Sequence, residues 1–102
     1  MKLFPTKDIK GAMAYAAAGR QALHMMTGEW AKGWGGPQCF RKAREFAHLF
    51  DQNADRLIGT ARRLGVRQVV VSERGTHRQH VDLCGRPLER AKAQADAIKE
   101  PA

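Results

Sequence analysis

A glycine-rich segment at residues 28–38, GEWAKGWGGPQ, interrupts the chain and limits how it can fold. Its four glycines and Pro37 disfavour regular structure, whereas the indole rings of Trp30 and Trp34 need cover from water. We interpret the segment as a loop with two alternatives for the indoles. They pack on the body of the domain, or they bind a nucleic-acid base or a partner protein.

The chain as a whole predicts one small α+β domain, over residues 1–102. This length supports a single hydrophobic core. Apolar residues recur at helical spacing over residues 9–26, 40–50, 54–64 and 87–98, and Gly65 stands where a helix C-cap glycine belongs. Residues 66–72 and 77–83 are typical of two strands joined by a turn at Gly75. We therefore expect three helices, a β-hairpin and a C-terminal helix.

Basic residues outnumber acidic residues by eighteen to ten, which gives a net charge of +8. From residue 56 to residue 90 every basic residue is an arginine. The planar guanidinium group suits phosphate and carboxylate, so we expect nucleic acid or an acidic protein surface as the partner. The alternative is a basic surface that only favours solubility. The predicted binding residues are Arg41, Arg44, Arg56, Arg63, Arg67, Arg74 and Arg78, together with Trp30 and Trp34.

The sequence also predicts the cellular setting. Lys10, Arg20 and His24 interrupt the longest apolar run, so no stretch is long enough to span a bilayer. The N-terminus lacks the apolar stretch of a signal peptide, so we expect a cytoplasmic protein. Cys39 and Cys84 are far apart and form neither a CxxC pair nor a zinc knuckle. In a reducing compartment both are expected to be buried thiols.

Residues 47–66, AHLFDQNADRLIGTARRLGV, and residues 80–93, HVDLCGRPLERAKA, contain a His-Leu pair, then Leu-Gly, then His-Val-Asp-Leu. In this order the motifs resemble a family of small bacterial and phage proteins classed as a domain of unknown function. The resemblance covers about half of the chain and implies an α-α-β-β-α arrangement over residues 41–99. Val81 stands where the family has an aromatic residue, and residues 1–40 do not match. The resemblance implies a bacterial or phage setting and no established activity.

His48, His80 and Asp82 are the candidate site residues. Alternate residues of a strand share a face, which places Asp82 beside His80, and His48 from the preceding predicted helix completes the cluster. Such a cluster suits metal or imidazole chemistry on phosphate esters. The alternative is structural, with buried hydrogen bonds that tie the hairpin to the second helix. The sequence favours the structural alternative and no bound metal, because no nucleophile, P-loop or dense metal-ligand motif is present.

Three functions follow from these observations. The sequence favours a small basic binding protein of phage or mobile-element type, acting on nucleic acid or on a host nucleic-acid-handling complex. An inhibitor of host defence or of the transcription machinery is one such protein. The second function is a metal- or histidine-dependent phosphoesterase that uses His48, His80 and Asp82. The third is a homo-oligomeric structural protein with its interface at Trp30 and Trp34. An enzyme is the less favoured class, and we expect no cofactor.

Overall fold

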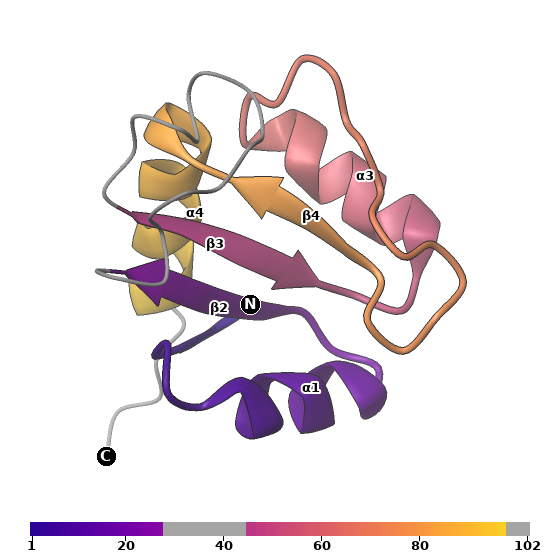
Figure 1. Cartoon of the computed structure of the whole chain (residues 1–102). Helices are drawn as coiled ribbons and strands as arrows, with labels where there is room; N and C mark the ends of the chain where they lie inside the picture. The colour runs from indigo at the N-terminus through magenta and orange to yellow at the C-terminus, as the bar shows by residue number, and fades with distance from the viewer. Residues whose placement is uncertain (28–44, 98–102) are drawn as a thin grey trace.

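The computed structural model describes residues 1–27 and 45–97, and a mixed sheet is its central element. The four strands, in spatial order, are β1 (Lys2–Phe4), β2 (Ala22–Thr27), β3 (Glu45–Phe50) and β4 (His80–Leu83). β1 is parallel to β2, whereas β3 is antiparallel to both β2 and β4. The described helices are α1 (Ile9–Ala17), α3 (Ala54–Arg63) and α4 (Gly85–Ala97). Figure 1 shows α4 behind the sheet and α1 below it, so the described chain forms an α+β domain.

The first predicted helix is too long, because its second half is a strand. α1 ends at Ala17, and Gly19 then adopts a left-handed backbone with a φ of 90°, which stops the helix. Residues 22–27 instead pair with β1 and β3 as strand β2. The helical spacing of Leu23 is misleading, because an alanine-rich stretch offers apolar side chains at any period.

The second predicted helix is wrong at residues 45–50, which form strand β3. Phe46 and Phe50 face one side of the sheet, whereas Ala47 and Leu49 face the other, and all four are buried. A short apolar run that is buried on both faces matches the helical period as well as that of a strand. Residues 45–50 form a strand and not a helix because they pair with both β2 and β4.

The predicted hairpin is also wrong, because β4 pairs with β3 and not with a strand at residues 66–72. Of these residues, Ser72 alone bridges to β4, through two backbone hydrogen bonds of 2.8 and 3.1 Å with His80. The preceding residues form no strand, and Val70 is 71% exposed. The strand predicted over residues 77–83 is also too long at its start. β4 begins at His80, and His77 lies in the turn before it.

The two helices predicted in the second half are present, and local contacts define the end of α3. α3 begins after Asn53, whose side chain accepts a hydrogen bond from the third helical backbone NH. It ends before Gly65, which has a φ of 100°. A Cβ atom on Gly65 would lie 2.5 Å from the guanidinium group of Arg90, which donates to the Leu64 carbonyl. The left-handed backbone therefore favours glycine at this helix end, and a larger residue would also displace the flexible Arg90 side chain.

Both faces of the sheet carry buried side chains. On one face, β2, β3 and β4 pack against α3 and α4. This larger cluster comprises Leu23, Met25, Ala47, Leu49, Leu57, Ala61, Leu64, Val81, Leu83, Leu88, Ala91 and Ala95. α1 packs on the opposite face, in a cluster of Phe4, Ala12, Ala16, Ala22 and Phe50. Because side chains alternate along a strand, the even-numbered residues of β3 and β4 lie on this second face.

Of the two expected buried thiols, Cys84 is buried as predicted, but the expectation that it is a thiol is wrong. This residue directly follows β4, is 5% exposed and is disulfide-bonded. Cys39 lies outside the described residues. Two widely separated cysteines carry no spacing signal, which is why the sequence does not predict a disulfide. The cytoplasmic location from which free thiols were expected stays a prediction.

Asp51 follows β3 and ties distant parts of the chain together. Its fully buried carboxylate accepts two hydrogen bonds of 2.7 Å from Arg56 and one of 2.9 Å from Gln21. Its backbone carbonyl accepts a hydrogen bond from the side-chain amide of Gln79 at 2.9 Å. Burial opposes ionisation, but hydrogen bonds from Arg56, Asn53 and Gln21 outweigh it and lower the pKa of Asp51.

We predict that Asp51→Ala lowers the free energy of unfolding by about 3 kcal/mol, because buried donors lose their acceptor. This value is at the low end of the stability loss expected when a buried ion pair is broken, because the Arg56 side chain is 42% exposed. Asp55→Ala removes an exposed carboxylate from the first turn of α3 and should change stability by less than about 1 kcal/mol. Urea unfolding at neutral pH measures both values, and equal losses would contradict the prediction.

The same contact predicts an acid-sensitive fold. The folded-state pKa of Asp51 is lowered, so its stabilising effect is present above about pH 4 and is lost as the pH falls through the folded value. Below about pH 4, the unfolding free energy of the wild type should therefore approach that of Asp51→Ala.

Candidate functional site

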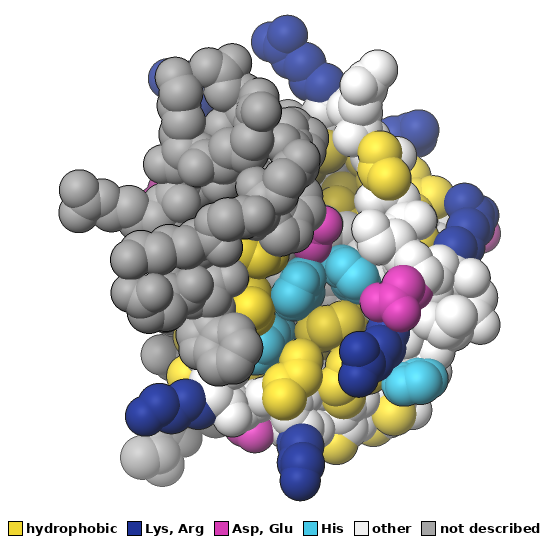
Figure 2. Space-filling model, viewed as in Figure 1, with side chains coloured by type: hydrophobic (Ala, Val, Ile, Leu, Met, Phe, Trp, Pro, Cys, Tyr) yellow, Lys and Arg dark blue, Asp and Glu magenta, His cyan; other side chains and the backbone are white. Residues whose placement is uncertain are grey.

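Three neighbouring strands place histidine and aspartate side chains on one face of the sheet. His24 of β2 lies opposite His48 of β3, and His48 lies opposite Asp82 of β4. His80 shares this face with Asp82, because one residue separates them on β4. Figure 2 shows histidine side chains gathered near the centre of this face, beside hydrophobic ones. The register of the sheet therefore brings together residues that are far apart in the sequence.

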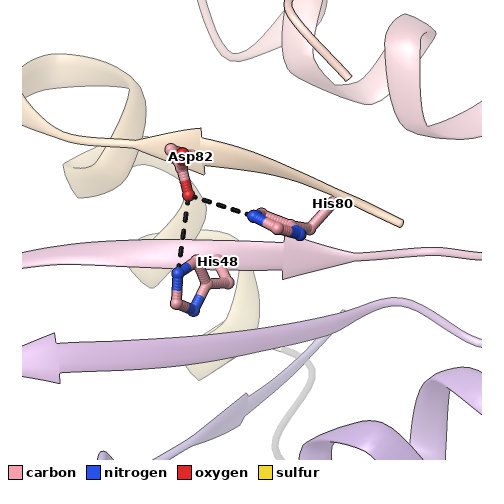
Figure 3. A group of neighbouring side chains, drawn as sticks. All are labelled: His48, His80 and Asp82. Atoms are coloured by element: carbon pink, nitrogen blue, oxygen red, sulfur yellow. Dashed lines mark ion pairs between the residues drawn. The ribbon is translucent and has the colours of Figure 1, made fainter. Parts of the chain in front are cut away.

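His48, His80 and Asp82 form a compact group (Figure 3). The Oδ1 atom of Asp82 lies 3.6 Å from Nε2 of His48 and 3.5 Å from Nε2 of His80. The two imidazole rings meet edge to face, with centroids 4.8 Å apart. The structure thus brings together the three candidate site residues, with His48 supplied by a strand and not by the helix expected for it.

Aromatic rings surround His48. His24 stacks on it with centroids 5.8 Å apart and an interplanar angle of 11°. Phe46 and Phe50 each approach it with centroids 5.5 Å apart. These contacts leave 21% of the His48 side chain exposed. The imidazole is therefore held in place by packing while it stays accessible from one side.

Backbone carbonyls orient two of the histidines. Nδ1 of His80 lies 2.6 Å from the carbonyl oxygen of Arg78, and Nε2 of His24 lies 3.0 Å from that of Thr6. A carbonyl oxygen only accepts hydrogen bonds, so each of these nitrogens carries the proton and donates it. The second nitrogen of His80, Nε2, is then directed toward Asp82.

Some polar atoms of the cluster are buried without a hydrogen-bond partner among the described residues. They are Oδ1 of Asp82 and Nδ1 of His24 and of His48. Buried polar groups in folded proteins are almost always hydrogen-bonded, and an unsatisfied one costs about 1 to 3 kcal/mol. A purely structural cluster would be expected to satisfy these atoms. The structural alternative, mutual hydrogen bonding of His80 and Asp82, therefore accounts for only part of the arrangement.

His48 and His80 have opposite pKa shifts. Burial lowers the pKa of His48 to about 4, and the neighbouring His80 and His24 add to this effect against the attraction of Asp82. Burial also opposes the charge of His80, but Asp82, the Arg78 carbonyl and the charge of Glu73 outweigh it and raise the pKa. At neutral pH, His48 is therefore uncharged, and protonation is easier at His80 than at an ordinary histidine.

The predicted arginine site lies only partly within the described residues. Arg41, Arg44, Trp30 and Trp34 lie outside them. Arg56 forms an ion pair with the buried carboxylate of Asp51, and 42% of its side chain is exposed. Arg63 is exposed and donates to Oγ1 of Thr60 at 3.2 Å. Arg67, Arg74 and Arg78 are exposed in the segment between α3 and β4.

Comparison with protein-family models, with curated proteins and with solved structures finds no match for this chain. The resemblance to a family of unknown function therefore stays a prediction. Among the helices of residues 1–27 and 45–97, none has the length and apolar character needed to cross a membrane.

We predict that NMR titration separates the two histidines of the cluster. His48 should stay neutral down to about pH 4, whereas the pKa of His80 should lie above its ordinary value. Asp82→Asn should lower the pKa of both rings, because it removes the carboxylate charge that favours their protonated forms. An unchanged pKa of His80 in Asp82→Asn would contradict the assigned cause.

Proposed function

We propose that the protein binds nucleic acid through an arginine surface that borders the histidine face. This arginine surface consists of the exposed residues Arg62, Arg63, Arg67, Arg74, Arg78 and Arg86. They come from the end of α3, the segment before β4 and the first turn of α4. Figure 2 shows Lys and Arg side chains around the rim of the face on which the histidines gather.

The lack of acidic partners is the observation that carries the proposal. Within the described part of the chain, none of the six side chains forms a salt bridge. Residues 62–90 contain only Glu73, Asp82 and Glu89 as acidic residues, and Asp82 faces the histidines. Unpaired guanidinium groups produce a positive potential that attracts the nucleic-acid backbone. Each planar guanidinium also matches two phosphate oxygens.

We predict that replacing Arg67, Arg74 and Arg78 together by Gln weakens binding to short DNA and RNA duplexes. The slope of log affinity against log salt should decrease by about 0.9 for each phosphate contact that is lost. A matched control replaces Lys7, Lys10 and Arg20 by Gln and removes the same charge from the region around α1. Fluorescence anisotropy over a salt series measures both slopes.

Two results would exclude this surface. If both triple variants lose affinity equally, binding follows net charge and not the arginine surface. If the wild type binds neither DNA nor RNA at low salt, nucleic acid is not the partner. Affinity purification would then test an acidic protein surface of a host complex as the partner.

A second function, phosphoester cleavage, is favoured by the opposite pKa shifts of His48 and His80. A neutral imidazole accepts a proton from an attacking hydroxyl group, and a protonated one donates a proton to the leaving oxygen or stabilises charge on phosphate. Asp82 lies within 3.6 Å of both rings on the same face, and Arg78 lies two residues from His80. Cleavage and nucleic-acid binding are compatible, because the arginine surface would bring the substrate to the rings.

For this second function we predict that the wild type cleaves RNA or DNA oligonucleotides. His48→Gln and His80→Gln should each lower the rate by about 100-fold or more, since each removes a proton-transfer group. His77→Gln changes the same residue type at an exposed position and should retain full activity. Gel analysis of labelled oligonucleotides, with and without chelator, measures the rates. A wild type without cleavage activity would exclude this function and leave the binding proposal intact.

A further inference from the structure

The ligand atoms of His48, His80 and Asp82 point to a use beyond nucleic-acid binding. One possible ligand atom from each residue lies within 4.8 Å of the ligand atoms of the other two. Among the described residues, no other group of three or more His, Cys, Asp or Glu side chains could hold a metal ion in this way. Figure 3 shows the Asp82 carboxylate joined by dashed lines to both imidazole rings. Two imidazoles and a carboxylate form a ligand set typical of divalent transition metals.

The distances fit metal coordination without rearrangement of the sheet. Zinc bonds to nitrogen and oxygen are about 2.0 to 2.2 Å long, so ligand atoms around a tetrahedral ion lie roughly 3.4 Å apart. The Oδ1 atom of Asp82 already lies 3.6 and 3.5 Å from the Nε2 atoms of His48 and His80. The ligand atoms of the two histidines lie within 4.8 Å of each other, so they must come closer to reach this spacing. Because the pairing of β3 and β4 holds their backbones, the movement falls to the side chains.

Two further observations support a cation at this point. Oδ1 of Asp82 is buried, and the ring nitrogens that face it lie at 3.6 and 3.5 Å, too far for good hydrogen bonds. His80 donates from Nδ1 to the Arg78 carbonyl, which leaves the lone pair of Nε2 for a ligand. Metal-binding histidines are commonly oriented by a backbone carbonyl in this way.

We propose that His48, His80 and Asp82 bind one divalent transition metal ion, with zinc and cobalt as suitable ions. The inference is independent of nucleic-acid binding. Imidazole ligands disfavour magnesium and calcium, which prefer oxygen. Three protein ligands leave at least one coordination position for water or a substrate oxygen, and the partial exposure of His48 and Asp82 gives access to it. His24 acts as a positioning residue, because its Nε2 donates to Thr6 while its ring stacks on His48.

The test is titration of chelator-treated full-length protein with Co²⁺ and Zn²⁺. Isothermal calorimetry should give one ion per chain, and Co²⁺ should produce visible ligand-field bands. His80→Gln and Asp82→Asn should each weaken binding at least tenfold and remove the bands. His77→Gln is the matched control and should bind like the wild type. The circular dichroism of each variant shows whether it is folded.

A second measurement needs no variant and therefore does not depend on folding of the mutants. In NMR spectra of the wild type, Co²⁺ should shift and broaden the ring signals of His48 and His80 before those of the exposed His77. Absence of stoichiometric binding in the wild type would overturn the proposal. So would a cobalt spectrum that is unchanged by folded Asp82→Asn, or paramagnetic effects confined to His77.

Discussion

The buried carboxylate of Asp51 is the contact on which the arrangement of the sheet depends. It joins Gln21 before β2 to Arg56 in α3, and its backbone carbonyl holds the side chain of Gln79. Gln79 directly precedes His80, so this backbone contact of Asp51 lies at the start of β4. The position of β4 in turn decides that Asp82 lies opposite His48. The stability of the fold and the geometry of the candidate site therefore both depend on Asp51, the first through its ionised carboxylate and the second through its backbone carbonyl.

The two faces of the sheet differ in chemistry. One face is apolar and is covered by α3 and α4, so it supplies most of the hydrophobic stabilisation. The other combines phenylalanine rings with imidazoles and a carboxylate, and some of these polar atoms have no hydrogen-bond partner within residues 1–27 and 45–97. A polar cluster on a rigid sheet is destabilising unless its hydrogen-bonding groups have partners. A cluster with unsatisfied polar groups is typical of sites that have a chemical function.

How far the sequence predicts this structure depends on how local each signal is. α3 is predictable because Asn53 and Gly65 act within one turn of its ends. β2 and β3 are not predictable, because their apolar runs fit the period of a helix as well as that of a strand. Only pairing with strands distant in the sequence decides that they are strands. Alternation places Asp82 beside His80 correctly. The involvement of His24 has no sequence signal, because it follows from its register opposite His48.

The candidate site is divided between two strands, since His80 and Asp82 belong to β4 and His48 belongs to β3. A slip of one residue between these strands would turn the side chains of one strand to the opposite face. Misregistered and partly folded chains thus lack the complete set of three side chains. A ligand that requires all three recognises only the native topology. Such a ligand would shift the folding equilibrium toward the native chain and act as a selective check on correct strand pairing.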